Sequence, residues 1–203
     1  RQITIEAVED AAQAKKLLYD RVGEQHYDII SALHKSMRGS DPDASIYWLG
    51  RMLEAGEDPL YIDRPLVRFA SEDVGMADTQ ALVVAMAAQQ AVHFIGMPEG
   101  NVALAQTSVY MATAPKSNSL YTAYKRVQEN IAKDPIEPVP LHLRNAPTGL
   151  MKNLGYGKGY KYAHDYPNHF VRQQNLPDSL KGKKFYFPSD QGQERIIADR
   201  WKQ

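Results

Sequence analysis

Apolar residues recur every three or four positions through the first two thirds of the chain, which is the spacing of amphipathic α-helices. Each run begins after a polar residue that can cap a helix and ends at Gly or Pro. Asp41-Pro42 and Asp58-Pro59 start two runs in the same way, with a carboxylate at the N-cap and proline in the first turn. The pattern predicts helices over 4–18, 27–37, 42–55, 59–74, 79–95, 101–114 and 118–131.

Two of these runs depart from a simple amphipathic pattern. Pro65 lies inside the run over 59–74, where its ring clashes with the preceding turn and its missing N–H removes a backbone hydrogen bond. We therefore expect a kink or break near Arg64. The run from Thr79 to Ile95 has no charged residue and is apolar on nearly every face. We therefore expect this helix to be covered on all sides, either at the centre of its domain or against another subunit.

The sequence changes in character after Lys133, because four prolines lie between positions 135 and 147. Extended chain and turns are expected there. The pattern then predicts a short helix over 148–154, a Gly- and Tyr-rich loop over 155–162, a small strand over 183–187 and a terminal helix over 193–201. The whole pattern predicts a mainly α protein with a loop-rich C-terminal extension and at most a small β element.

The formal net charge is zero, from 24 Lys and Arg against 24 Asp and Glu. The balance hides two unlike segments, because residues 1–141 carry −6 and residues 142–184 carry +6. Lys152, Lys158 and Lys161 lie among tyrosines in the basic segment, a combination that can contact phosphates and stack on bases. A purely structural role for this loop is the alternative.

Composition and spacing exclude several kinds of site. The 203 residues contain no Cys, so disulfides, thiolate catalysis, iron–sulfur clusters and cysteine zinc sites are ruled out. Neither Gly155–Gly159 nor Ala114–Ser117 has the spacing of a phosphate-binding loop. His164, Asp165 and His169 are metal-ligand types without a metal-binding spacing, so we expect neither a metal site nor a catalytic centre here.

Two adjacent carboxylates, Glu72 and Asp73, stand out near the middle of the chain. Arg68 interrupts the apolar strand that would have to precede them in a nucleotide-binding motif. We expect them either to pair with an arginine, for which the candidates are Arg51, Arg64 and Arg68, or to cap a neighbouring helix. A metal-dependent nuclease that uses Glu72, Asp73 or His164 is kept as an alternative.

The chain begins at Arg1 without an initiator Met or an apolar leader, so we expect it to be part of a longer protein. The uncharged stretch Thr79–Met97 approaches the length of a membrane span. Gln89, Gln90 and His93 occupy its middle and no Lys or Arg flanks its ends, so no membrane partner is expected.

Longer strings are more specific than these patterns. They are Arg38–Ala44, Tyr47–Leu49, Glu57–Tyr61, Val67–Gly75, His93–Glu99, Ala114–Asn118, Pro140–Thr148 and Leu154–Tyr162. In this order they closely resemble the C-terminal region of the RarA/MgsA family of AAA+ ATPases, which includes Werner helicase-interacting protein. The resemblance runs from about Ile3 to Phe187. One departure is Ile62-Asp63-Arg64-Pro65, where relatives usually read Ile-Ala-Arg-Arg, while Arg64 and Arg68 keep the family pattern.

The resemblance implies the C-terminal part of a replication-fork ATPase related to clamp loaders. It implies the end of an AAA+ lid subdomain over 1–23, a helical, collar-like oligomerisation domain over 24–134, and a basic extension over 135–203 that packs on it. ATP and Mg²⁺ would be held by an N-terminal module outside this sequence. The fragment itself is therefore expected to have no cofactor and no enzyme activity.

Partners and location also come from the resemblance. The expected partners are further copies of the chain in a homotetramer, DNA in forked or single-stranded form, and single-strand-binding protein. The location would be cytoplasmic and nucleoid-associated in a bacterium. A purely structural assembly domain without DNA contact is the alternative function.

Two sets of candidate residues follow. The interface candidates lie in the uncharged helices and are Leu82, Met86, Phe94, Leu104 and Tyr110. The DNA-binding candidates lie in the basic segment and are Arg144, Lys152, Tyr156, Lys158, Tyr160 and Lys161.

Overall fold

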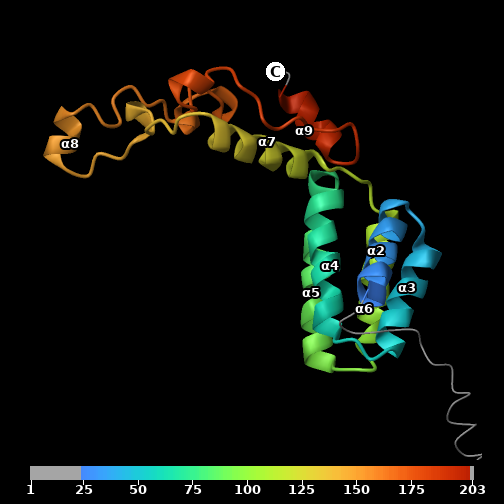
Figure 1. Cartoon of the computed structure of the whole chain (residues 1–203). Helices are drawn as coiled ribbons and strands as arrows, with labels where there is room; N and C mark the ends of the chain where they lie inside the picture. Colours follow the sequence, from blue (N-terminus) through green and yellow to red (C-terminus); the bar gives the residue numbers. More distant parts are fainter. Residues whose placement is uncertain (1–23, 202–203) are drawn as a thin grey trace, which may run out of the picture. The chain divides into compact units, whose positions relative to one another are not determined.

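The computed structural model describes residues 24–201, which are helical with connecting turns and contain no strand (Figure 1). The mainly α fold class is thus confirmed. The helix predicted over 4–18 lies outside the described residues. The chain divides into two compact units: a helical unit of residues 24–123 and 186–201, and a second unit of residues 124–185.

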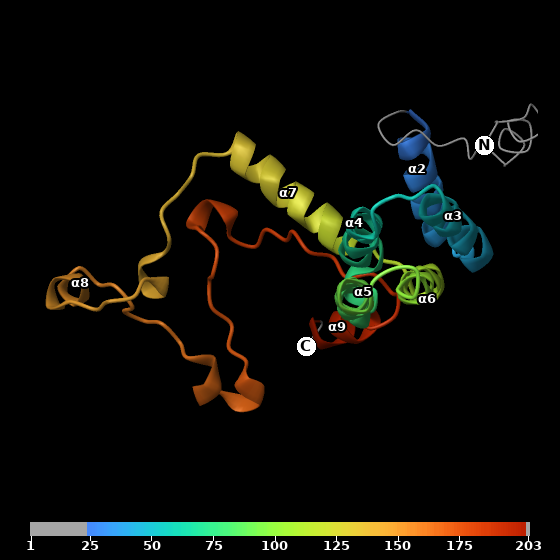
Figure 2. The same ribbon diagram turned by 90° about the horizontal axis from the view of Figure 1, so that it is seen from below.

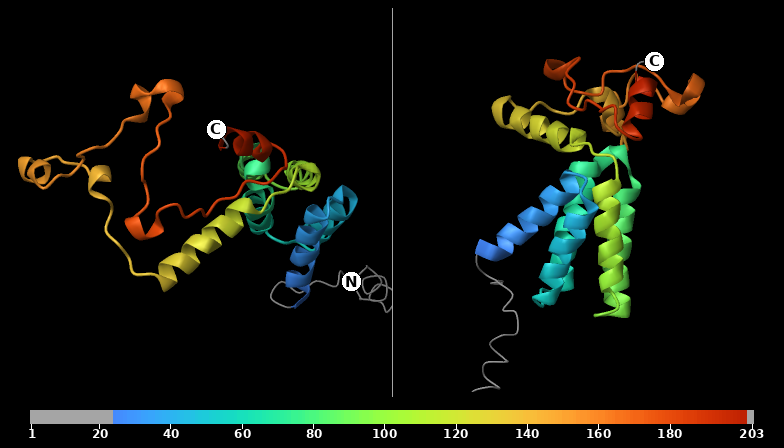
Figure 3. Two further views of the ribbon diagram at one scale, coloured as in Figure 1. Left: turned by 90° about the horizontal axis from the view of Figure 1, so that it is seen from above. Right: turned by 90° about the vertical axis from the view of Figure 1, so that its right-hand side faces the viewer.

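Five helices form the body of the helical unit. They are α2 (Glu24–Arg38), α3 (Pro42–Glu54), α4 (Pro59–Phe69), α5 (Gln80–Ile95) and α6 (Asn101–Thr113). α3 packs against α2 and α6, and α5 packs against α4 and α6 (Figures 2 and 3). Their fully buried side chains include Leu33, Met37, Leu49, Met52, Ile62, Leu66, Phe69, Leu104 and Met111. Each contributes roughly 1.5–3 kcal/mol by leaving water, so this core is the main source of stability of the unit.

Aspartate side chains start three of these helices, as the sequence predicts. Asp41 Oδ1 accepts a hydrogen bond from the Ala44 N–H at 2.9 Å, and Asp58 Oδ1 accepts one from the Leu60 N–H at 2.9 Å. Asp78 Oδ1 is 3.0 Å from the backbone nitrogen of Gln80 at the start of α5. Each carboxylate satisfies an N–H that has no partner within the helix.

Of the kink or break expected near Arg64, the break is wrong, because α4 continues through Pro65 to Phe69. Ile62, Leu66 and Phe69 are buried on both sides of the proline, and their packing holds the helix against the core. The geometry changes after α4 instead, to a π-helical turn over Ala70–Val74 and a 3₁₀ turn over Gly75–Ala77.

The chain returns to the helical unit at its C-terminal end. α9 (Glu194–Trp201) belongs to this unit, and the Gln193 N–H donates to the Ala77 carbonyl at 2.7 Å. The boundary between the units also falls inside α7 (Ser119–Lys133), after Ala123. The single extension expected over 135–203 is therefore wrong, because its last residues, 186–201, belong to the helical unit. The terminal helix expected over 193–201 is confirmed.

The second unit has little core of its own. Of residues 124–185, all of which are described, Asn130 alone is buried. Besides the later part of α7, the unit contains α8 (Gly149–Asn153) and four short 3₁₀ turns. Thr148 caps α8, which confirms the short helix predicted over 148–154, whereas the strand predicted over 183–187 is absent from these described residues. Turns and side-chain hydrogen bonds hold this unit rather than buried apolar area.

Candidate assembly surface and basic loop

α5 has one buried face and one exposed apolar face. Ala81, Ala85 and Ala88 lie in the interior, where their small side chains allow close approach to neighbouring helices. The exposed side chains, called here the α5 face, are Leu82, Val83, Met86, Phe94 and Ile95. Phe94 is 91% exposed. The described part of its own unit therefore does not enclose α5, and contact with another subunit, the second expected environment, stays a prediction.

The interface candidates are placed differently by the structure. Leu82, Met86 and Phe94 lie on the α5 face. Leu104 is 0% exposed, so its assignment to an interface is wrong, because a side chain inside the core cannot contact a second chain. Tyr110 packs against the core, and its hydroxyl donates to Asp78 Oδ2 at 2.6 Å, a bond that with burial raises the pKa of Tyr110 to about 12.

The paired carboxylates Glu72 and Asp73 are each bound to an arginine. Arg68 Nε lies 2.6 Å from Glu72 Oε2, one of the predicted pairings. Asp73 pairs with Arg38, which was not among the predicted partners. Arg38 Nε and Nη2 donate to the two carboxylate oxygens of Asp73 at 2.5 and 3.0 Å. The Asp73 backbone carbonyl also accepts from the Ser117 N–H at 2.7 Å. Three of the family-like strings thus meet at one end of the bundle in a structural contact.

These pairings bear on the nuclease alternative. Glu72 and Asp73 lie in the helical unit, while His164 lies in the second unit. The part of the chain that the structure describes has no group of three His, Asp or Glu that could hold a metal ion. It also has no helix long and apolar enough to cross a bilayer.

A buried cluster ties the C-terminal segment to the start of α7. Glu194 is 0% exposed, and its carboxylate accepts hydrogen bonds from Ser117 Oγ at 2.5 Å, from Ser119 Oγ, and from the Tyr186 hydroxyl at 2.6 Å. The N–H and Oγ of Ser189 donate to it at 2.9 and 2.5 Å. Burial works to raise the pKa of Glu194, but these hydrogen bonds outweigh it and lower that pKa to about 2. Nothing in the local sequence indicated this cluster.

The basic loop of the second unit is shaped by glycine. Gly155, Gly157 and Gly159 have φ angles of 83°, 72° and 81°, a conformation that side-chain-bearing residues rarely adopt. The Gly157 N–H donates to the Leu141 carbonyl at 2.9 Å and joins the loop to the preceding turn. The alternating glycines are therefore required by the backbone.

The six DNA-binding candidates fall into two groups. Arg144 donates to the Val139 carbonyl at 2.6 Å and to the Tyr156 hydroxyl at 3.3 Å, so both Arg144 and Tyr156 hold the loop together. The exposed group, whose side chains have no partner among the described residues, comprises Lys152, Lys158, Tyr160 and Lys161. The ammonium groups of these three lysines are available to an anionic ligand.

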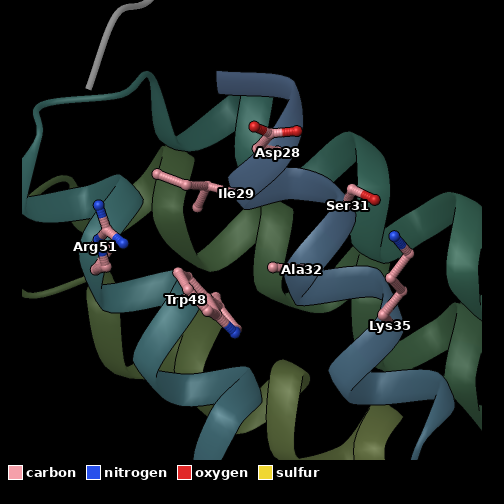
Figure 4. A pocket seen from close by; sticks show the side chains of 7 residues that line it. All are labelled: Asp28, Ile29, Ser31, Ala32, Lys35, Trp48 and Arg51. Carbon is pink, nitrogen blue, oxygen red and sulfur yellow. The ribbon is translucent and has the colours of Figure 1, made fainter. Parts of the chain in front are cut away.

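The helical unit also has a groove of about 490 Å³ between α2 and α3 (Figure 4). Asp28 and Lys35 line it from α2, and Trp48 and Arg51 line it from α3. Ser31 is its one hydroxyl, and the described residues that line it include no histidine to activate a nucleophile.

Comparisons with known sequences show the family of the chain. Residues 39–203 match the sequence model of the family described as MgsA AAA+ ATPase C terminal, and residues 1–38 match that described as AAA C-terminal domain. The chain is 50% identical over 183 residues to replication-associated recombination protein A of Haemophilus influenzae, which covers 90% of this chain and 41% of that protein.

Two further relatives are similar over most of the chain. Replication-associated recombination protein A of Escherichia coli K12 is 45% identical over 201 residues, covering 98% of this chain and 45% of that protein. ATPase WRNIP1 of Dictyostelium discoideum is 52% identical over 175 residues, covering 86% of this chain and 20% of that protein. The chain thus spans less than half the length of these relatives.

Proposed function

Because the chain belongs to the MgsA family of AAA+ ATPases, as its C-terminal region, we propose that it is the assembly module of a replication-associated recombination ATPase. It joins further copies of itself into a homotetramer and does not hydrolyse ATP on its own. ATP and Mg²⁺ belong to a module outside this sequence. The α5 face is the observation that carries this proposal.

A second copy of the chain is the partner that suits the α5 face. No charged residue occurs between positions 79 and 97, so identical faces can meet without placing like charges against each other. The exposed Gln90 and His93 on the same helix are uncharged, so they add no charge to such a contact. Covering these side chains would contribute roughly 25 cal/mol for each Å² of apolar surface removed from water.

Adding charge to the α5 face should separate the subunits. The double variant Val83→Asp/Phe94→Asp is expected to be monomeric in light scattering, whereas the wild type should have four times the 22.8 kDa mass of the chain. Burying two unpaired carboxylates in an interface costs several kcal/mol each. Ile131→Asp, an exposed apolar position on α7, is the matched control and should leave the mass unchanged. A wild type that is monomeric at high micromolar concentration would refute the proposal.

A second function, contact with fork or single-stranded DNA, is supported by the exposed lysines of the basic loop. Lys152, Lys158 and Lys161 lie in a segment of charge +6 and have no side-chain partners among the described residues. Tyr160, half exposed beside them, offers a ring on which a base can stack. This function is compatible with assembly, since the α5 face belongs to the other unit.

Removing the three lysine charges should weaken DNA binding and its dependence on salt. For Lys152→Ala/Lys158→Ala/Lys161→Ala, the slope of log K against log salt for single-stranded DNA is expected to fall by about 2, at about 0.7 per phosphate contact. The measurement is fluorescence anisotropy of a labelled oligothymidylate over a salt series. Lys35→Ala/Lys125→Ala/Arg195→Ala removes the same charge elsewhere and should keep most of the slope. Equal slopes in wild type and loop variant would show that the loop is purely structural.

A further inference from the structure

The second unit contains a groove of about 300 Å³ between the last turns of α7 and residues 183–185. Four cationic side chains line it: Arg126 and Lys133 from α7, and Lys183 and Lys184 from the returning segment. The acidic residues in its lining are Glu129 and Asp134. Their charges leave an excess of two positive charges in the lining, which favours an anionic ligand.

Some of these polar groups hold the groove in shape. Arg126 Nη1 donates to the Phe185 carbonyl at 3.0 Å and fixes the returning segment to α7. Asp134 Oδ2 accepts from Asn130 Nδ2 and lies 3.5 Å from Lys183 Nζ. Asp134 is thus already engaged by two partners and does not neutralise the other lysines.

The remaining two lysines are free to bind a ligand. Lys133 and Lys184 are exposed, and neither side chain has a hydrogen bond or ion pair with any of the described residues. They belong to opposite sides of the groove, one on the helix and one on the returning segment. Two unpaired ammonium groups facing one cavity match a ligand that carries phosphate.

An aromatic ring completes the lining. Phe185 is half-buried in the groove, and Lys183 Nζ lies 5.8 Å from the centre of its ring. An aromatic face beside cations is the arrangement with which proteins bind single-stranded nucleic acid, since the base stacks and the phosphates meet the charges. The volume is at the lower end of the range for ligand pockets, which suits one nucleotide and not a duplex.

We propose that this groove binds one nucleotide of a single-stranded DNA chain, with Lys133 and Lys184 on its phosphates and Phe185 against its base. The proposal rests on the DNA contact proposed above and adds a site that does not include the loop lysines. It assigns a binding role to α7 and to the segment 183–185, whose residues are not among the DNA-binding candidates from the sequence.

The test compares two double variants of the 203-residue chain. Lys133→Ala/Lys184→Ala removes the two unpaired cations of the groove, and Lys125→Ala/Lys181→Ala removes the same charge from the same two segments outside the groove lining. With labelled oligothymidylate, the groove variant should lose about 1.4 from the salt slope, at about 0.7 per contact, while the control keeps the wild-type slope. Phe185→Leu should weaken binding at least about fivefold with the slope unchanged, because stacking does not release counterions.

The possible outcomes separate the two proposals. A wild type that does not bind oligothymidylate at low salt would overturn both the DNA function and the groove. Binding by the wild type with equal slopes in the groove variant and the wild type, or equal losses in the groove and control variants, would overturn the groove alone. Circular dichroism of each variant verifies that the fold is kept, so that a loss of binding reports on the groove.

Discussion

Replacing Glu194 by alanine is expected to lower the free energy of unfolding of the helical unit by about 3 kcal/mol near pH 7. The carboxylate is fully buried and accepts hydrogen bonds from Ser117, Ser119, Tyr186 and Ser189. Alanine would leave those donors buried without an acceptor. Because Ser117 and Ser119 precede the second unit in the chain and Tyr186 and Ser189 follow it, we also expect the C-terminal segment to detach from the start of α7.

The contribution of Glu194 should depend on pH in one direction. The pKa of Glu194 is about 2 in the folded protein and 4.5 as the ordinary value, so the stabilisation is complete above about pH 4.5 and is lost as the pH falls towards 2. The wild type should therefore lose stability over this range, and the part due to Glu194 should be missing in Glu194→Ala.

Urea unfolding followed by circular dichroism, and by Trp201 fluorescence in a Trp48→Phe background, measures both effects. The Trp201 ring lies 5.5 Å from that of Tyr186, so its emission reports on release of α9. Glu129→Ala removes an exposed carboxylate without a side-chain partner among the described residues and should change stability by less than about 0.5 kcal/mol. If Glu194→Ala is as stable as the control, the cluster does not hold the C-terminal segment.

Replacing Asp63 by alanine is expected to have the opposite effect and to raise the free energy of unfolding by about 2 to 3 kcal/mol near pH 8. Asp63 is 2% exposed in α4, and neither carboxylate oxygen has a hydrogen-bond partner in the described structure. Burial without a partner disfavours the charged form and raises the pKa of Asp63 to about 6. Alanine removes this cost and favours the helix more than aspartate does.

The pH dependence of this effect distinguishes it from a general gain in helix stability. The ordinary pKa of an aspartate is 3.8, so Asp63 does not lower the free energy of unfolding below that pH. The destabilisation by its buried charge grows as the pH rises and is complete above about pH 6. The gain from Asp63→Ala should therefore shrink on going from about pH 8 to pH 4. Urea unfolding at several pH values measures it.

Asparagine at position 63 is the matched control for this prediction. Asp63→Asn keeps the shape of the side chain and cannot ionise, so it should remove the part of the pH dependence of stability that is due to Asp63, while its amide still lacks partners. A loss of stability in Asp63→Ala near pH 8 would contradict the prediction and would mean that the carboxylate has a favourable role in the core.

The starts of the helices could be predicted from the sequence because capping is local. Asp41, Asp58 and Asp78 each bind an N–H two or three residues further along the chain, so the signal and its effect lie within one turn. The family could also be recognised, since it depends on ordered strings of residues. The candidate lysines of the basic loop are exposed, as a binding role requires.

Other features depended on packing between distant segments. Leu82 and Leu104 both lie in helices without charged residues, so no charge pattern showed which of them faces water. Pro65 reads as a helix breaker, but the buried residues around it keep α4 continuous. Arg38 pairs with Asp73 across 35 positions, a separation that no local pattern reports.

The two buried carboxylates show most clearly what only the tertiary structure decided. The sequence by itself determined the family and the helices that contain Asp63 and Glu194. It did not show that the two carboxylates differ in their surroundings. Whether each carboxylate stabilises the protein depends on the hydrogen-bond donors that reach it once it is buried. Glu194 receives them from segments up to 77 positions away, and Asp63 receives none from the described residues. Folding brings such groups together, and that is why their opposite effects on stability could not be predicted from the order of residues.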